Sequence, residues 1–381
     1  MAARKSESRD TLPGQLVLLL SFWTLLLAAM ALLIFMSRSP EAGSLPGVQL
    51  VQSPSFSLRG ADPSQLALVG SSLVRVGEEG IAVLDASGQE QSFIDFPYRE
   101  SQVFPMGQGL LVTPLRGSGY LALFPDLSAH ESSLNETVYG ADYQEPYLLT
   151  FGPSLKGRFV ASLLDTRLNT YRAVLTFDSL QWPLSVSFVP GTPLFDVVLL
   201  DMTQGEPITR YMTYDLDGQL VNRLNLPAEG LLPHQMHLSG GRTLLFSQEA
   251  GFLYDHGTGT AKAVEMPSGN PVQAENRLGQ GVLLTKEGGK GTLSLTLEGD
   301  AGRETLFQRL QTQEGVNCFA LAPSGHFLLA ADDRGLMMVE TSGGQIQSRL
   351  ETDQPLVRLL ALSDQYFLLI FQEEAAILTV R

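Results

Sequence analysis

The chain has 381 residues, of which 44% are hydrophobic and only 17% are charged, so it holds enough apolar material for a sizeable core. Its formal net charge of −15 argues against a phosphate-binding surface, and we expect no nucleic-acid partner. The same charge favours a neutral or basic protein partner. The single cysteine, Cys318, excludes an internal disulfide, and its apolar surroundings in the sequence predict a buried thiol.

The N-terminal region predicts a membrane anchor. Residues 1–15 are polar, and Leu16–Met36 is an almost uninterrupted apolar run. At about 1.5 Å per residue, such a helix would span a hydrocarbon core of about 30 Å. Arg4, Lys5 and Arg9 precede the run, so the positive-inside rule predicts a cytoplasmic tail at 1–15 and an extracytoplasmic location for the remainder.

A cleaved signal peptide is the alternative to this anchor. The apolar run is longer than the usual signal-peptide core of about 7–15 residues. A small-residue pattern occurs at Ser37-x-Ser39, but Pro40 follows it directly and would hinder cleavage. We therefore expect an uncleaved transmembrane helix at 16–36, a linker at 37–47 and an extracytoplasmic all-β domain at 48–381. The expected localisation is the cell membrane, crossed once.

The β domain is built from repeats, and the clearest copy runs from residue 315 to residue 351. Four apolar runs of about five residues alternate there with turns rich in Gly, Pro and Asp, a pattern typical of an antiparallel meander. The expected strands are Cys318–Leu321, Phe327–Ala331, Leu336–Glu340 and Ile346–Leu350. One meander cannot bury both of its faces, so neighbouring copies must cover it.

Eight such units can be followed along the chain, at intervals of roughly 36–48 residues that are typical of four-stranded propeller blades. We expect their first strands near Leu66, Gln102, Tyr147, Leu184, Leu232, Val272, Val316 and Leu356. The fold class is therefore an all-β propeller with eight blades, seven being the alternative number. The last unit has only three strands, at 356–362, 366–371 and 375–380. We expect residues 48–58 to supply its fourth strand and close the ring.

Two repeat families resemble parts of this sequence. Residues 322–331, Ala-Pro-Ser-Gly-His-Phe-Leu-Leu-Ala-Ala, are similar to the turn and second strand of WD40 repeats. The runs at 80–88, 211–218, 251–259 and 335–344, in each of which an apolar strand ends in a carboxylate and a glycine follows, resemble quinoprotein-type (PQQ) propeller repeats. The whole plan resembles uncharacterised single-pass envelope proteins of Firmicutes. The chain lacks the repeated tryptophans of both families, having only Trp23 and Trp182, so we expect no quinone and no other cofactor.

Two short motifs could carry metal chemistry. His234 and His237 have the spacing of two ligands on one helical face, but in a strand this spacing directs the side chains to opposite faces, so no metal site is expected. Asp215 and Asp217 resemble the start of a calcium loop, but the glutamate of its twelfth position is missing. A hairpin turn explains them better.

The remaining polar motifs also have structural explanations. Asp332-Asp333 and Glu373-Glu374 are expected to be solvated turns, and Gly288–Thr292 lacks the glycine spacing of a phosphate loop. Asn135 begins a glycosylation sequon. No nucleophile elbow or dinucleotide fingerprint is present in the sequence. We therefore predict no catalytic, cofactor-binding or metal-binding residues.

The expected function is a non-enzymatic, membrane-anchored scaffold that holds a protein of the cell envelope. One alternative is a module that binds a glycan or peptide in the central funnel, using aromatic residues such as Tyr139, Tyr143, Tyr147 and Trp182. A hydrolase or oxidoreductase with carboxylates on the funnel rim is the other. A cluster of inward-pointing carboxylates or aromatic residues in the funnel would favour the alternatives, and a featureless funnel with an apolar patch on the rim would favour the scaffold.

Overall fold

The computed structural model places residues 44–381 in one compact unit. The structure describes residues 48–58, 65–70, 72–85, 87–98, 100–106, 108–226, 232–277, 279–296, 307–310 and 315–381. The predicted tail at 1–15, transmembrane helix at 16–36 and linker at 37–47 lie outside these residues. Within the described ranges, no helix is both long enough and apolar enough to cross a membrane.

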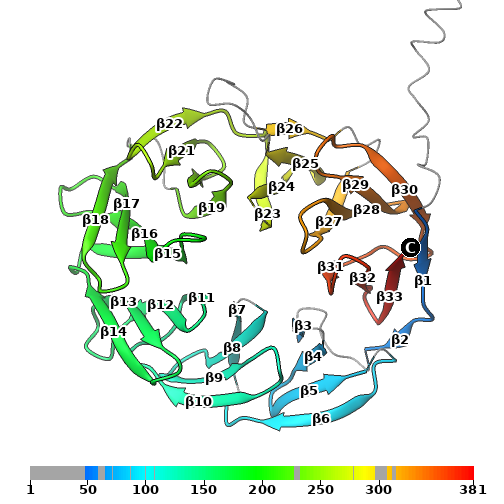
Figure 1. Cartoon of the computed structure of the whole chain (residues 1–381), viewed down its shortest axis with the longest axis horizontal. Helices are drawn as coiled ribbons and strands as arrows, with labels where there is room; N and C mark the ends of the chain where they lie inside the picture. The colour runs from blue at the N-terminus through cyan, green and yellow to red at the C-terminus, as the bar shows by residue number, and fades with distance from the viewer. Residues whose placement is uncertain are drawn as a thin grey trace, which may run out of the picture. The chain divides into compact units, whose positions relative to one another are not determined.

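The compact unit is a ring of antiparallel sheets around a central axis, and each sheet is one blade (Figure 1). Blade 1 contains β3 (Leu66–Val69), β4 (Ser72–Val76), β5 (Gly80–Leu84) and β6 (Glu90–Asp95). Blade 2 contains β7 (Ser101–Met106), β8 (Gly109–Pro114), β9 (Gly119–Leu123) and β10 (Ala129–Ser133). Blade 3 contains β11 (Gly140–Gln144), β12 (Tyr147–Pro153), β13 (Phe159–Asp165) and β14 (Thr170–Thr176). Blade 4 contains β15 (Gln181–Phe188), β16 (Leu194–Asp201), β17 (Ile208–Asp215) and β18 (Leu220–Asn225).

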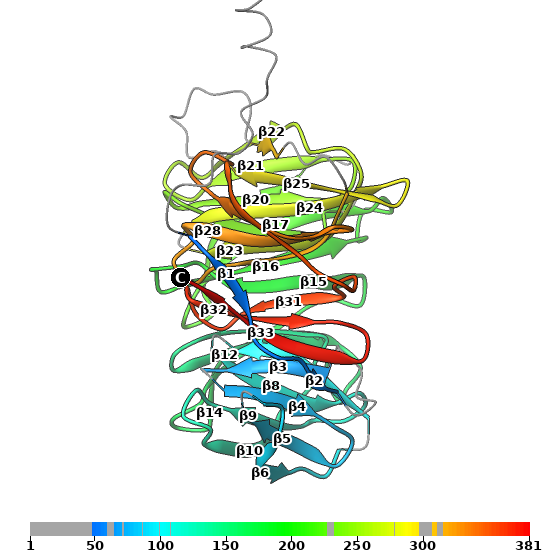
Figure 2. The same cartoon turned by 90° about the vertical axis from the view of Figure 1, so that its right-hand side faces the viewer.

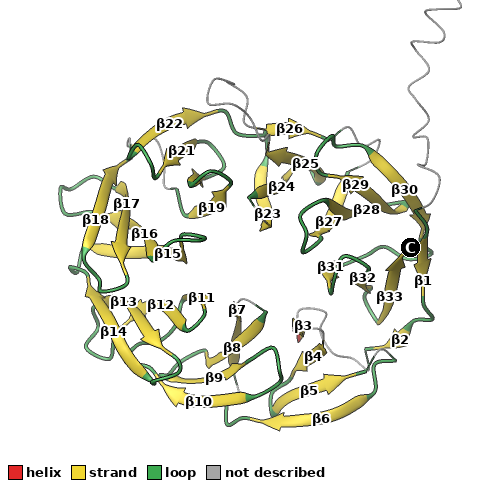
Figure 3. Cartoon of the chain, in the orientation of Figure 1, coloured by secondary structure: helices red, strands yellow, loops and turns green. Residues whose placement is uncertain are grey.

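The second half of the ring repeats this pattern, and the described residues form strands and turns throughout (Figure 3). Blade 5 contains β19 (His234–Leu238), β20 (Arg242–Phe246), β21 (Gly251–Asp255) and β22 (Thr260–Val264). Blade 6 contains β23 (Asn270–Arg277), β24 (Gln280–Glu287), β25 (Lys290–Thr296) and β26 (Phe307–Arg309). Blade 7 contains β27 (Val316–Leu321), β28 (Phe327–Asp332), β29 (Gly335–Glu340) and β30 (Ile346–Glu351). Blade 8 contains β31 (Arg358–Ala361), β32 (Tyr366–Ile370), β33 (Glu374–Val380), β1 (Leu50–Gln52) and β2 (Phe56–Ser57).

The prediction of eight blades is confirmed, and seven of the eight predicted first strands lie in, or within two residues of, the observed ones. The prediction at Tyr147 is wrong, because this residue begins β12, the second strand of blade 3. The true first strand, β11, has the sequence Gly-Ala-Asp-Tyr-Gln, and all five of its residues are only partly buried. Such a polar strand lacks the apolar signal that marks the other units.

The ring closes through the N-terminal residues of the described chain. Leu50 of β1 pairs with Val380, and Phe56 of β2 pairs with Ala375, so both short strands lie along β33. Residues 48–58 therefore occupy the place expected of them, at the outer edge of blade 8. Without them, β33 would present an unpaired edge.

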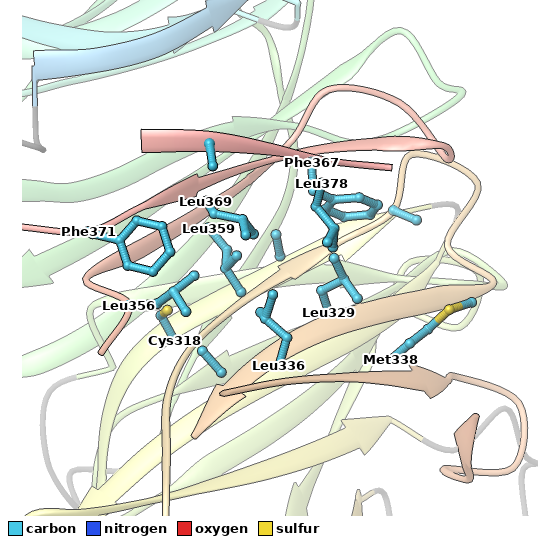
Figure 4. Close-up of a cluster of buried hydrophobic side chains, with 14 residues drawn as sticks. Cys318, Leu329, Leu336, Met338, Leu356, Leu359, Phe367, Leu369, Phe371 and Leu378 are labelled. Carbon is cyan, nitrogen blue, oxygen red and sulfur yellow. The ribbon is translucent and has the colours of Figure 1, made fainter. Parts of the chain in front are cut away.

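The core is distributed between neighbouring blades. Between blades 7 and 8, apolar side chains from both sheets interlock, among them Leu336, Leu359 and Phe367 (Figure 4). Cys318 lies in this cluster and is 6% exposed, and burial raises the pKa of its thiol to about 12. The prediction of a buried cysteine is confirmed. Each blade is thus apolar on both sides, which explains the nearly continuous apolar runs of the second and third strands.

The alternating strands give the disc two faces (Figure 2). We call one the connection face: it carries the blade-to-blade connections and the turns between second and third strands. We call the other the cavity face: it carries the turns between first and second strands and between third and fourth strands. Gln49 bonds to Arg381, and Val380 bonds to Gln365 of the β31–β32 turn, so the described chain begins at the cavity face.

Candidate functional site

A cavity of about 570 Å³ opens where the innermost strands of blades 3 to 6 meet at the cavity face. Its wall combines apolar groups such as Phe188 and Met236 with polar ones from β11, β19, β23, the β19–β20 turn and the start of β20. The polar lining consists of Asp142, Gln235, His237, Ser239, Arg242, Glu275 and Asn276. The Gln235 amide is buried, and neither its nitrogen nor its oxygen has a hydrogen-bond partner among the described residues. A buried amide of this kind calls for a water or a polar ligand.

Two carboxylates of the cavity wall join neighbouring blades. Asp142 Oδ2 accepts a hydrogen bond of 2.7 Å from the Phe188 amide, and Glu275 Oε2 accepts one of 2.9 Å from the Leu321 amide. Burial raises the pKa of both carboxyl groups. Each bond links residues that are 46 positions apart, so the first joins blade 3 to blade 4 and the second joins blade 6 to blade 7 in the same way. These carboxylates therefore link the inner strands of adjacent blades, and the blade repeat places them beside the central axis.

Behind the cavity wall, a polar cluster joins blades 4 and 5. Asp196 of β16, His237 of β19 and His256, directly after β21, each offer one ligand atom, and these atoms all lie within 4.8 Å of one another. The Asp196 side chain is fully buried and that of His256 is 12% exposed. This cluster contains the only group of three or more potential metal ligands found among the described residues.

Hydroxyl groups hold the three side chains in place. Asp196 accepts hydrogen bonds from Tyr211 and from Thr213, the latter at 2.7 Å. His237 contacts Ser187 Oγ through Nε2 at 2.6 Å and Thr243 Oγ1 through Nδ1 at 2.8 Å. His256 Nε2 lies 2.9 Å from the same Thr243 oxygen. A single hydroxyl thus lies between the two imidazoles, and it has one hydrogen to donate.

Burial determines the charges of the cluster. It raises the pKa of Asp196 to about 7 and, together with His256, lowers the pKa of His237 to about 4. Burial also lowers the pKa of His256. At neutral pH both imidazoles are therefore uncharged, and the 3.6 Å contact between His256 and Asp196 is not a strong ion pair. Neutral imidazole is the form that binds metal ions.

The two histidines of the sequence motif do not come together in the structure. His234 is exposed and does not join His237, as the strand period predicted. His237 instead meets His256, which sequence reasoning missed because the two lie on separate strands of blade 5. The order of strands in the blade repeat could have indicated this contact. The first and third strands of a blade both lie beside the second, so residues of these two strands can approach one another.

The acidic motifs act in turns, with one correction. Asp215 Oδ1 accepts hydrogen bonds from the amides of Asp217 and Gln219, which confirms the turn explanation. Asp332 is only 2% exposed, so the prediction that it is solvated is wrong. Asp332 ends β28. Its carboxylate accepts hydrogen bonds from two amides of the following turn and contacts Arg349 at 3.3 Å. The carboxylate thus takes the place of water as the partner of these donors.

The other motifs also lie in turns and connections. Glu373 and Glu374 lie at the β32–β33 turn, where Glu374 accepts hydrogen bonds from Ser55 and Gln354. Gly288 and Gly289 form the β24–β25 turn with positive φ angles of 56° and 84°. Asn135, the residue of the glycosylation sequon, is exposed in the β10–β11 connection.

The aromatic residues considered for the funnel do not gather there. None of Tyr139, Tyr143, Tyr147 and Trp182 lines the cavity. Tyr139 is 56% exposed on the connection face, and Tyr147 stacks with Arg172 at 5.7 Å from the ring centre.

The connection face carries exposed apolar side chains over blades 2 to 4, which we call the apolar arc. Its members are Leu115 (43% exposed), Tyr139 (56%), Leu155 (76%) and Leu180 (47%). The turns and connections that bear the arc also carry exposed Arg116, Lys156 and Arg158, against the exposed carboxylates of Asp178 and of Glu100, whose carbonyl oxygen accepts a 2.7 Å hydrogen bond from the Leu115 amide. None of these three cations has an ion-pair partner within the described part of the chain. The arc is thus apolar and locally basic on an otherwise acidic protein.

Comparisons with known proteins support the fold. No protein-family model matches the chain, and no curated protein matches its sequence. Among solved structures, BamB from Moraxella catarrhalis is 13% identical, with a TM-score of 0.54, over 87% of this chain and all of that one. The Cps50 (Swd1) β-propeller domain of Myceliophteria thermophila is also 13% identical over the same shares, with a TM-score of 0.47. The first likeness supports the all-β propeller fold.

Proposed function

We propose that this eight-bladed propeller is a non-enzymatic scaffold that binds a protein partner through its connection face. The apolar arc carries this proposal, because Leu155 alone is 76% exposed, and exposed leucines on loop tips gain free energy when a partner covers them. Leu115 and Leu155 occupy equivalent turns of adjacent blades, so a partner can cover both at once. A polar rim around such residues is typical of protein interfaces.

The charges beside the apolar arc indicate which kind of partner would bind it. The overall charge of −15 favoured a neutral or basic partner, but the arc itself has Arg116, Lys156 and Arg158 beside its leucines. We therefore infer that the partner presents an acidic segment with apolar side chains. Complementary charge of this kind steers association and makes it sensitive to salt.

We further propose that the propeller is held outside the cell membrane by the apolar run at 16–36, as part of the cell envelope. A linker of about ten residues, at most about 3.5 Å each when extended, would keep the propeller within a few tens of Å of the membrane.

Photo-crosslinking in the native membrane tests the scaffold. A photoreactive residue replaces Leu155 in the full-length chain, and Leu168 serves as the control, since it is 70% exposed at the other end of β13, on the cavity face. We expect one discrete adduct from position 155, with an acidic crosslinked peptide, and none from position 168. The adduct should weaken in high salt and disappear in Lys156→Glu/Arg158→Glu. Equal labelling at both positions would rule out the arc as the binding surface.

Protease accessibility tests the location. Protease added to intact protoplasts should digest a C-terminal tag and spare an N-terminal tag. The reverse pattern, or release of the β domain without protease, would contradict the uncleaved anchor.

A second candidate function is the binding of a small polar ligand in the cavity. It is favoured by the Gln235 amide, whose two polar atoms are buried without partners among the described residues, in a cavity of about 570 Å³. Gln235→Leu would remove this demand for hydrogen bonds. If the scaffold is the function, Gln235→Leu should leave the crosslink at position 155 unchanged.

A further inference from the structure

We propose that Asp196, His237 and His256 form a binding site for one divalent transition-metal ion, with zinc as the best fit, between blades 4 and 5. Two imidazole nitrogens and one carboxylate oxygen are a donor set that zinc prefers. The proposal is independent of the partner on the connection face, because it concerns the opposite end of the blades.

The spacing of the donors fits an ion at the centre. Ligands at about 2.0–2.2 Å in a tetrahedron lie about 3.4 Å from one another. His256 Nε2 and Asp196 Oδ2 are 3.6 Å apart, and all three ligand atoms lie within 4.8 Å of one another. Side-chain shifts of well under 1 Å would bring the set to ligand distance. The Thr243 hydroxyl, 2.8 and 2.9 Å from the two imidazoles, or a water would complete the coordination.

The second layer of the site supports the same assignment. Metal-binding histidines commonly donate their other ring N–H to an oxygen, and ligating carboxylates are themselves hydrogen-bonded. His237 contacts Ser187 Oγ through Nε2 at 2.6 Å, which leaves Nδ1 facing the cluster. Tyr211 and Thr213 donate to the two oxygens of Asp196 and fix the plane of its carboxylate.

Charge gives a physical reason for a cation at this point. Asp196 is fully buried, and no Lys or Arg among the described residues forms an ion pair with it, so its carboxylate lacks a permanently positive partner. A divalent ion would supply the missing charge and keep the carboxylate ionised. An ion can reach the cluster from the cavity, because His237 is also part of the cavity wall.

The ion would join strands of two blades. Asp196 belongs to blade 4, whereas His237 and His256 belong to blade 5, so binding stabilises the interface between them by mass action. Since the site lies beside the cavity, zinc would also fix one side of its wall. We therefore assign the ion a structural role.

Metal titration of the full-length, detergent-solubilised protein tests the site. After chelator treatment, Zn²⁺ alone is added while calorimetry and the melting temperature are followed. We expect one equivalent to bind and to raise the melting temperature, and Co²⁺ in its place to give the visible absorption of a tetrahedral site. His237→Ala and His256→Ala should each weaken binding by more than about tenfold, and Ser187→Ala by about tenfold or more.

The matched control is His234→Ala, on the same strand and outside the cluster, which should bind zinc like the unaltered protein. Asp196→Asn keeps the shape of the side chain and should bind more weakly. Folding of each variant is checked by protection of the Cys318 thiol between blades 7 and 8, remote from the site. The proposal fails if folded His237→Ala and His256→Ala bind zinc as tightly as the unaltered protein. It also fails if the unaltered protein binds no zinc, or if His234→Ala weakens binding equally.

Discussion

The amide of Leu58 donates a hydrogen bond of 2.9 Å to the carbonyl oxygen of Glu373, so the two ends of the described chain are joined in blade 8. Leu58 is 4% exposed and packs with residues of blades 8 and 1. The contact closes the ring at the point where the outer strand leads on to blade 1.

This closure predicts the effect of a truncation. A chain that begins at Gly60 lacks β1, β2 and Leu58, whose burial alone is worth about 1.5–3 kcal/mol. It should melt well below a chain that begins at Leu45 and should aggregate through the bare edge of β33. Thermal unfolding of the two proteins measures the difference. Equal melting temperatures would contradict closure by residues 48–58.

Glu136 predicts a pH effect on stability. It is fully buried, Oε1 accepts a 2.6 Å bond from Thr150, and Oε2 has no hydrogen-bond partner among the described residues. Burial raises the pKa of this carboxyl above its ordinary value of 4.5. As the pH rises above 4.5, the unfolded chain loses this proton first. Stability therefore falls until the folded-state pKa is passed, and is fully regained below 4.5.

The substitution Glu136→Gln removes the ionisable carboxyl group and therefore the loss of stability at rising pH. The free energy of unfolding of the variant, relative to the unaltered protein, should increase between pH 4 and pH 7 by about 1–3 kcal/mol. Urea unfolding at both pH values provides the measurement, and Glu131→Gln, at an exposed site on β10, should show little change. A relative stability of Glu136→Gln that falls with pH would refute the assignment.

Gly152 of β12 predicts a steric effect. A Cβ at this position would lie 1.8 Å from the Thr137 carbonyl oxygen, whose backbone belongs to the connection entering blade 3. Because backbone must move to make room, Gly152→Ala should destabilise the fold by about 1–3 kcal/mol or more. Gly77→Ala is the control, since its nearest neighbour would be 3.6 Å away. Chemical denaturation that finds the two variants equally stable would contradict the close approach.

Cys318 predicts slow thiol labelling. It is 6% exposed, and burial raises its pKa to about 12, so at pH 8 the folded protein should hold almost no accessible thiolate. A thiol reagent should label it only after denaturant is added, with one equivalent per chain because it is the only cysteine. Rapid labelling of the native protein would show that the interface between blades 7 and 8 opens readily.

Local patterns in the sequence determined the architecture. Apolar runs of about five residues, turn residues between them and a repeat of roughly 36–48 residues together specify blades, and the short last unit specifies where the ring closes. Asp215 could be predicted as a turn residue because its hydrogen bonds go to amides two and four positions ahead. Such contacts depend on neighbours in the sequence alone.

The candidate sites were decided by tertiary structure. His237 and His256 belong to different strands, and Asp196 comes from another blade, so only the packing of blades 4 and 5 brings them together. The apolar arc likewise depends on which turns share a face, and residues 115, 139, 155 and 180 are too far apart in sequence to form a motif. Strand β11 was missed for a related reason. Its polar residues are held by contacts with the next blade, such as the hydrogen bond between Asp142 and Phe188. The periodicity of apolar residues in the sequence indicates which side of a strand is buried. Which residue of the neighbouring blade it contacts depends on how the blades are arranged around the ring.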